Sequence, residues 1–350
     1  MNNIIETILI IKLSSIGDVI HSLPLLEVLR CRFPYAKIDW VVEEEASGVL
    51  EDHPCIDRLF IFPRKGWLKR FIKKGECITV GKEISHFIRQ LKGRKYDIVI
   101  DLQGLFKSGI LTFLARGKRK IGLDGAREGS NIFIDERISF PDPDMHALDR
   151  YLCIARYLGT NSFTWNGMIP ICNKDKKHVH RLLENIRDNS TLIAINPMAR
   201  WDSKLWDPDR FACLADRITD IFGAEVVFTG SEDDKTAIEN ILSMMKTKAL
   251  NLAGKTNLKE LAYLYQRCAI VISTDTGPMQ VAAAMKSPVV IALFGPTSPS
   301  KTGPYGEKHK AISAHMDCSP CFKKRCKDMS CMKEITVDMV FDSVKEVISA

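Results

Sequence analysis

The 350-residue sequence predicts two α/β domains, each built on a parallel sheet with helices on both faces. Two observations support this class. Short runs rich in Ile, Val and Leu alternate with segments whose apolar residues recur at helical spacing, the pattern of βαβ units. This pattern weakens into polar sequence at about 160–189 and then starts again. We therefore place an inter-domain linker there and predict one domain over 1–170 and a second over 171–335.

The first predicted unit is a strand at 7–13, a tight turn at 14–18 and a helix that carries Val19, Leu23, Leu26 and Leu29 on one face. Further strands are predicted at 38–42, 58–62 and 96–102, with helices at 82–91 and 105–115. In the second half we expect strands at 192–196, 224–228, 249–252, 269–273 and 289–294, and helices at 210–221, 233–245, 258–266 and 279–285. A last amphipathic helix, at 336–350, is expected to pack back on the first domain.

Composition narrows the class of protein. A hydrophobic fraction of 45% excludes a disordered chain, and a net charge of +7 with both signs mixed favours attraction to phosphates or anionic lipid over nucleic-acid binding. The segment RKGWLKRFIKK at 64–74 is typical either of a membrane-surface helix or of a solvated basic helix face. The N-terminal residues lack the basic region of a signal peptide, so we predict a cytoplasmic protein whose eleven cysteines are reduced.

The first turn that follows a predicted strand contains a carboxylate. Ligands of open α/β sheets bind at the carboxyl ends of the strands, so such turns are where functional residues are expected. Asp18 stands in the sequence SSIGD at 14–18, where the following helix begins. It either caps that helix or acts as a general base at the mouth of a cleft, and spacing alone leaves both open.

Two turns of the second half contain groups suited to phosphate. Arg200 and Lys204 follow the strand at 192–196, and such cations suit a departing diphosphate, although a solvated loop is the alternative. The sequence STDTGP at 273–278 joins a strand to a helix, so Gly277 would let an anion approach the helix N-terminus while Asp275 binds sugar hydroxyls. None of these turns has the G-x-G-x-x-G pattern of a nicotinamide enzyme.

Four cysteines lie close together in the sequence between 318 and 331. They have the spacing C-x2-C-x4-C-x4-C and could bind zinc or an iron–sulfur cluster. The spacing is not the paired C-x2-C of a zinc ribbon, and the intervening cations could instead mark a basic surface loop, so we expect no metal. The residues are Cys318, Cys321, Cys326 and Cys331.

Seven segments in order resemble the ADP-heptose:lipopolysaccharide heptosyltransferases of glycosyltransferase family 9. They are KLSSIGDVIH (12–21), IDWVVEE (38–44), DLQGLFKS (101–108), SKLW (203–206), TGSE (229–232), TDTG (274–277) and FGPT (294–297). The resemblance covers nearly the whole chain, and IDWVVEE most resembles the heptosyltransferase that adds the first heptose to Kdo. It implies a GT-B fold, two Rossmann-like domains whose parallel sheets face a central cleft, and transfer with inversion that needs no metal or other cofactor.

The resemblance also implies roles for single residues. Asp18 becomes the general base, which suits a carboxylate within reach of an acceptor hydroxyl. The implied ADP-heptose site of the second domain consists of Arg200, Lys204, Glu232, Asp275, Thr276, Gly277 and Gln280. The implied site for the acidic acceptor, Kdo-lipid A at the inner face of the cytoplasmic membrane, consists of Ser15, Gly17, Arg64, Lys65, Lys107 and Arg127.

One position departs from the family pattern and leaves alternatives open. Gln280 stands where members usually have His, and glutamine donates a hydrogen bond but carries no charge, so the donor sugar stays open. A later heptosyltransferase or a member that uses another sugar is the alternative within the family. A nucleotide-sugar epimerase would gain nothing from the basic segment at 64–74, and a non-catalytic nucleotide-sugar or lipid-surface binding protein would not need Asp18.

Overall fold

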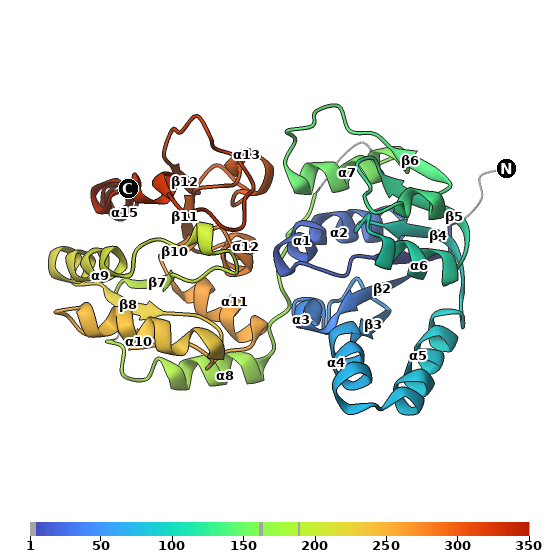
Figure 1. The fold of residues 1–350 in the computed structure, drawn as a ribbon, viewed down its shortest axis with the longest axis horizontal. Coiled ribbons are helices and arrows are strands. Elements are labelled where there is room, and N and C mark those ends of the chain that lie inside the picture. Colours follow the sequence, from blue (N-terminus) through green and yellow to red (C-terminus); the bar gives the residue numbers. More distant parts are fainter. Residues whose placement is uncertain (1–4, 161–163, 188–189, 350) are drawn as a thin grey trace. The chain divides into compact units, whose positions relative to one another are not determined.

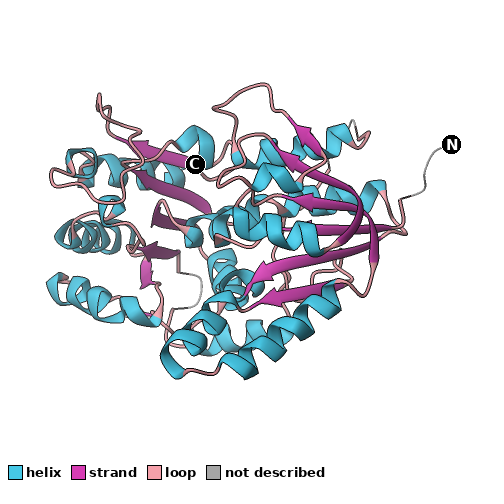
Figure 2. Ribbon diagram, turned by 45° about the vertical axis from the view of Figure 1, so that its right-hand side comes forward, coloured by secondary structure: helices cyan, strands magenta, loops and turns pink. Residues whose placement is uncertain are grey.

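The structure, a computed structural model, describes residues 5–160, 164–187 and 190–349. The chain folds into two compact units, Met1–Pro170 and Ile171–Ala350. Each unit contains a six-stranded, fully parallel sheet with helices packed on it (Figures 1 and 2). The α/β class predicted from alternating strand and helix patterns is therefore confirmed.

The sheet of the first unit has the strand order β3-β2-β1-β4-β5-β6. Its central strands are continuous apolar runs because both faces are covered: Leu9 and Ile11 pack among the helices of one face, and Ile8 and Ile10 are equally buried on the other. The strands are β1 (Thr7–Ile11), β2 (Lys37–Glu43), β3 (Arg58–Phe62), β4 (Lys95–Asp101), β5 (Arg116–Leu123) and β6 (Glu136–Ile138).

Helices α4, α5 and α6 supply apolar side chains to the core on the Leu9 face, among them Trp67, Phe87 and Leu111. Helices α1, α2 and α7 pack against one another. The helices of this unit are α1 (Ile16–His21), α2 (Leu23–Arg32), α3 (Glu44–Ser47), α4 (Arg64–Lys74), α5 (Cys77–Leu91), α6 (Phe106–Leu114) and α7 (Ala147–Tyr157), with the short 3-10 helix η1 (Ser130–Phe133).

The sheet of the second unit has the equivalent order β12-β11-β10-β7-β8-β9. Its strands are β7 (Leu192–Asn196), β8 (Glu225–Phe228), β9 (Leu250–Asn251), β10 (Ile270–Thr274), β11 (Val289–Phe294) and β12 (Lys310–Ser313). Its helices are α8 (Asn173–Leu182), α9 (Pro208–Phe222), α10 (Lys235–Met244), α11 (Leu258–Arg267), α12 (Gly277–Ala284), α13 (Pro299–Thr302), α14 (Ser330–Lys333) and α15 (Val337–Ser349), with the 3-10 helices η2 (Asp202–Lys204) and η3 (Glu232–Asp234).

The last helix differs from its predicted placement. Helix α15 is part of the second unit, where it packs on α9, β11 and β12, whereas the sequence assigned it to the surface of the first domain. Its apolar stripe, Val340, Phe341 and Val344, is buried in the core of that unit, and the Phe341 ring stacks on Phe222 of α9 with the centroids 5.5 Å apart. Periodicity predicts that such a helix exists, but it does not reveal which apolar surface covers it.

The predicted linker is the second difference. Residues 161–163 and 188–189 of the range 160–189 lie outside the described residues, but α8 occupies much of the remainder. Its sequence NKDKKHVHRL has a single buried aliphatic side chain, Val179, so the apolar periodicity that marks a helix is missing. Within the described ranges, no helix has the length and apolar character needed to cross a membrane.

Candidate active site

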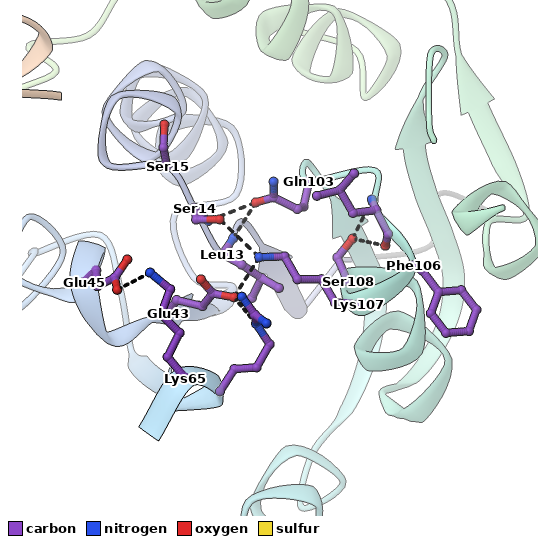
Figure 3. Close-up of polar contacts among 12 residues, drawn as sticks. Leu13, Ser14, Ser15, Glu43, Glu45, Lys65, Gln103, Phe106, Lys107 and Ser108 are labelled. Atoms are coloured by element: carbon purple, nitrogen blue, oxygen red, sulfur yellow. Dashed lines mark hydrogen bonds and ion pairs between the residues drawn. The ribbon is translucent and has the colours of Figure 1, made fainter. Parts of the chain in front are cut away.

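The first unit has a topological switch point between β1 and β4. The chain passes from β1 to β2 on one side of β1, and β4 lies on its other side, so this is the position at which open α/β sheets bind ligands. The Gln103 side chain joins the two loops, because its Oε1 accepts hydrogen bonds from the amides of Leu13 (3.1 Å) and Ser14 (2.9 Å) (Figure 3). The predicted SSIGD turn therefore lies at a position where this class of fold binds ligands.

Asp18 is partly buried at the third position of α1. Its Oδ2 accepts hydrogen bonds from the Ser15 amide and the Ser15 hydroxyl, both at 2.9 Å, so it does cap the helix start. Both bonds use the same oxygen, and Oδ1 accepts no hydrogen bond from a residue that the structure describes. Burial alone would raise the pKa of Asp18, but the Lys12 ammonium and the Ser15 donors outweigh burial and hold the pKa below its ordinary value.

A buried glutamate gathers two of the predicted acceptor-binding cations beside this turn. Glu43, which ends β2, accepts hydrogen bonds at Oε1 from Lys107 Nζ (2.7 Å) and Arg64 Nε (2.9 Å). Lys107 also donates to the Ser14 hydroxyl at 3.2 Å, which ties this cluster to the turn (Figure 3). Burial would raise the pKa of Glu43, but the hydrogen bonds from Lys107 and Arg64 keep it low, so the carboxylate is ionised.

The other predicted acceptor-binding residues lie on neighbouring loops. Lys65 at the start of α4 pairs with Glu45 of α3. Arg127 is exposed, and its amide donates to the Gly104 carbonyl at 2.8 Å, which sets it beside the loop that carries Gln103. Ser15 and Gly17 belong to the Asp18 turn itself. The loops at the carboxyl edge of this sheet are therefore rich in cations, two of which are held by Glu43.

The second unit also has charged side chains at the switch point of its sheet, but here a lysine pairs with an aspartate. Its switch point lies between β7 and β10, and there Lys204 meets Asp275, although 71 positions separate them in the sequence. Lys204 Nζ lies 2.6 Å from Asp275 Oδ2 and 3.1 Å from the Asp275 carbonyl oxygen, and 4.5 Å from the centroid of the Trp201 ring. An ammonium has three donors, so one of them remains for another acceptor.

The loop after β11 completes this cluster. The Thr297 hydroxyl donates to Asp275 Oδ2 at 2.6 Å, so the carboxylate is held from two loops. Thr276 and Gly277 begin α12 directly beside Asp275, and the first backbone amides of a helix are groups that bind anions. Gln280 on the same helix is buried, and its Nε2 donates to the Thr302 carbonyl at 2.7 Å, so in this structure the side chain fixes α13.

Two predicted donor-binding residues are exposed on the same sheet edge. Arg200 lies in the loop after β7 and Glu232 opens η3 after β8. Gly254, with a φ of +71°, lies so close that a Cβ there would clash with the Glu232 carboxylate. The structure therefore brings Lys204, Asp275, Thr276 and Gly277 together, whereas Arg200 and Glu232 stand on the loops around this group.

The segment at 318–331, which contains the four cysteines, forms hydrogen bonds to the loop that carries Lys204 and to the loop after β11. Ser203 Oγ donates to the Lys323 carbonyl at 2.6 Å, and the amides of Cys321 (3.0 Å) and Phe322 (2.8 Å) donate to the Pro296 carbonyl. All four thiols are free. Among the described residues, which include this whole segment, no three His, Cys, Asp or Glu side chains are arranged to hold a metal ion.

Comparison with known proteins decides the family. The family model described as glycosyltransferase family 9 (heptosyltransferase) matches residues 84–331, which is more than half of the chain. The chain belongs to glycosyltransferase family 9. It is therefore a glycosyltransferase, and the GT-B class predicted for the fold is confirmed by its structural neighbours.

Relatives and solved structures of this family cover almost the whole chain. The lipopolysaccharide core heptosyltransferase OpsX of Haemophilus influenzae is 26% identical over 98% of this chain and 97% of its own length. Lipopolysaccharide heptosyltransferase 1 of Pseudomonas aeruginosa is 28% identical over 91% and 87%. Among solved structures, the glycosyl transferase family 9 protein of Veillonella parvula has a TM-score of 0.84 at 25% identity and covers 100% of this chain and 99% of that one. The Escherichia coli heptosyltransferase WaaC with ADP has a TM-score of 0.74 at 25% identity and covers 97% and 99%.

Sequence reasoning missed four polar residues that organise the two clusters. They are Lys12, Glu43, Gln103 and Thr297, and each follows or ends a strand at the carboxyl edge of a sheet. All four lie inside the segments that carried the family resemblance. Their position in the sequence could have identified them, because ligands bind at the carboxyl ends of the strands and polar residues there are candidates for the site.

Proposed function

We propose that this glycosyltransferase transfers heptose from ADP-heptose to the Kdo of a lipopolysaccharide inner core, with inversion at the anomeric carbon. The observation that supports it is the placement of the two clusters, each at the switch point of its sheet: a carboxylate with cations in the first unit, and Lys204 with Asp275 in the second. An alcohol acceptor with acidic groups needs a carboxylate to take its proton and cations to bind those groups, as in the first unit. A diphosphate leaving group needs a cation such as Lys204, as in the second unit.

In the proposed reaction the first unit prepares the acceptor. Asp18 Oδ1 takes the proton of the acceptor hydroxyl as its oxygen attacks the anomeric carbon, while the bonds from Ser15 hold the carboxylate in position. Arg64 and Lys107 bind the acidic groups of the acceptor, with Lys65 and Arg127 at the margin. Glu43 fixes the first two cations at 2.9 and 2.7 Å, so their heads are oriented before the acceptor arrives.

The second unit binds the donor and stabilises the departing ADP. Lys204 offers its remaining donor to a phosphate oxygen, and the amides of Thr276 and Gly277 at the start of α12 bind the same diphosphate. Asp275 holds heptose hydroxyls, and Glu232 and Arg200 contact the ribose and phosphate from the outer loops. As the bond to the sugar breaks, negative charge grows on the phosphate oxygen, and the Lys204 ammonium lowers the energy of that state.

The proposed function predicts one product. Purified protein incubated with ADP-heptose and Kdo-lipid A should increase the mass of the lipid by one heptose residue and release ADP in equal amount. ADP-glucose and UDP-glucose serve as control donors, and a lipid A that lacks Kdo as control acceptor. Transfer from a control donor at a higher rate would assign another sugar, and release of free heptose without a glycolipid product would exclude the proposed acceptor.

We further propose that α4 attaches the protein to the cytoplasmic face of the inner membrane, where such an acceptor is anchored. Trp67 is buried against Phe62 and Phe87, but Leu68 (51%), Phe71 (51%) and Ile72 (69%) are exposed. The exposed cations Lys69 and Lys73 lie on the same helix. Exposed apolar side chains between cations fit a surface of anionic headgroups.

Replacing the three exposed apolar residues of α4 should weaken vesicle binding. Leu68→Gln, Phe71→Gln and Ile72→Gln together remove the groups that would insert, so affinity for vesicles containing phosphatidylglycerol should fall by about tenfold or more in a sedimentation assay. Ile221→Gln removes an apolar residue of similar exposure (60%) from α9 and should leave binding unchanged. Equal binding by the triple variant and the wild type would exclude α4 as the attachment surface.

A further inference from the structure

Helix α6 has an outer face without polar side chains. Its three exposed residues are Phe106 (48%), Ile110 (39%) and Phe113 (63%), and their spacing places them on one side of the helix. A surface helix of a globular protein normally presents charged or polar side chains on that side. The short helix η1, which packs on α6, adds Ile132, which is 72% exposed. We call these four residues the α6–η1 face.

The rings of this face belong to a packed aromatic row. Phe133 of η1 contacts both rings of α6, with its centroid 6.0 Å from that of Phe106 and 6.0 Å from that of Phe113. A Cβ at Gly109 would come within 2.3 Å of the Phe133 ring, so η1 can approach α6 this closely only because residue 109 is glycine. The sequence therefore builds an ordered apolar surface here, at the outside of the unit.

Cations lie beside the α6–η1 face. Lys120 Nζ is 5.5 Å from the centroid of the Phe113 ring, and Arg127 is exposed on the loop that leads into η1. Lys107 is on the first turn of α6, and its ammonium reaches the Ser14 hydroxyl at the switch point of the sheet (Figure 3). The apolar face thus begins next to the proposed acceptor-binding cluster and has positive charge at its margin.

This combination of apolar and positive groups selects one kind of partner. The carboxylates nearest in the chain, Glu128 and Asp135, already accept hydrogen bonds from the amides of Phe106 (3.3 Å) and Lys120 (3.0 Å). A second copy of the chain, packed symmetrically on this face, would bring cations such as Lys120 of the two copies together, and like charges oppose such a contact. A layer of anionic lipid offers apolar chains below negative headgroups and fits both features.

We propose that the α6–η1 face inserts into the lipid layer that carries the acceptor, and thereby sets Lys107 and the Glu43 cluster at the level of the acceptor's acidic groups. The inference rests on the proposed function, in which the acceptor is an acidic sugar joined to lipid. Helices α4 and α6 both pack on the Leu9 face of the sheet, so one lipid layer can contact the outer sides of both. In this arrangement α4 attaches the protein and the α6–η1 face orients it.

Insertion is tested with a tryptophan placed in the face. Phe113→Trp keeps an aromatic ring at the position, and vesicles that contain brominated phosphatidylglycerol quench the emission of a tryptophan that reaches the acyl chains. We expect quenching beyond that of the five native tryptophans, measured with the wild type. Ile221→Trp on α9, in the second unit, should show no additional quenching. Equal quenching of Phe113→Trp and the wild type would overturn the inference.

Transfer to a lipid-borne acceptor provides the second test. Ile110→Gln, Phe113→Gln and Ile132→Gln together should lower kcat/KM for Kdo-lipid A in phosphatidylglycerol vesicles by about tenfold or more, because the apolar groups that enter the lipid are lost while α4 is intact. With an acceptor from which the acyl chains have been removed, kcat/KM should keep its wild-type value. Ile221→Gln with Met244→Gln removes exposed apolar residues from the second unit and should change neither value.

The remaining outcomes each assign the face to something else. An equal loss with both acceptors means that the substitutions damage the acceptor site, and a loss with neither means that the face has no part in transfer. A wild type that forms dimers by light scattering, with a monomeric triple variant, would assign the face to self-association. If the wild type transfers heptose to neither acceptor, the proposed function is wrong, and the quenching of Phe113→Trp still decides whether the face enters the lipid.

Discussion

Asp18→Asn is expected to lower kcat for transfer by about 10²- to 10⁴-fold, the usual contribution of a general base. Asparagine has nearly the same shape and keeps an oxygen that can accept the hydrogen bonds from the Ser15 amide and hydroxyl, both 2.9 Å long in the structure. It has no negative charge with which to take a proton. ADP affinity, measured by calorimetry, should stay at the wild-type value because the proposed donor contacts belong to the second unit.

A matched variant separates catalysis from helix capping. Asp175 occupies the same third position in the capping box of α8, where its Oδ2 accepts a hydrogen bond from the Cys172 amide at 2.9 Å. Asp175→Asn therefore alters an equivalent cap and should leave kcat unchanged. If Asp18→Asn turned over at the wild-type rate, or if both variants lost activity and thermal stability to the same extent, Asp18 would be a capping residue and not the base.

Lys204→Met should weaken ADP binding by about 10- to 100-fold, since hydrogen bonds to charged groups contribute about 1.5–3 kcal/mol. Methionine keeps most of the apolar stem of lysine and removes the ammonium. Transfer should slow as well, because charge on the departing diphosphate grows as the sugar bond breaks. Calorimetry with ADP and with adenosine identifies the cause: adenosine has no phosphate, so its affinity should not change.

The comparison with adenosine is needed because Lys204 also pairs with Asp275 at 2.6 Å. Loss of the ammonium leaves Asp275, which is 8% exposed, with the Thr297 hydroxyl and without a cation, and this could disturb the loops. Such a disturbance would weaken ADP and adenosine alike. Lys345→Ala removes an exposed cation of α15 and serves as the charge control. Unchanged ADP affinity in Lys204→Met would remove Lys204 from the donor site.

The central strands of both sheets were predictable because burial on both faces leaves uninterrupted apolar runs, as in β1, β7, β10 and β11. Strand β5 was missed: its sequence RGKRKIGL carries four cations, and only Ile121 and Gly122 are buried. Helix α8 was missed for the same physical reason, since a helix with one buried aliphatic side chain has no apolar stripe. Apolar periodicity in the sequence arises from burial, so it does not reveal strands and helices with few buried side chains.

The candidate site was predictable as a set of loops but not as a set of paired side chains. Strand-end positions identified the turns that contain Asp18, Lys204 and Asp275. The pairing of Lys204 with Asp275 depends on β7 lying next to β10, and strand order is a property of the whole sheet. The same holds for Glu43, whose carboxylate holds Lys107 and Arg64 because β2, α4 and α6 meet at one edge.

The anomeric configuration of the transferred heptose shows whether the acceptor attacks the donor directly, because attack by a hydroxyl that Asp18 has deprotonated is a single displacement. Proton–carbon coupling at the anomeric centre of the isolated glycolipid, compared with that of the ADP-heptose supplied, gives the answer by NMR. We expect the opposite configuration in the product. A product with the configuration of the donor would contradict direct displacement and, with it, the role assigned to Asp18.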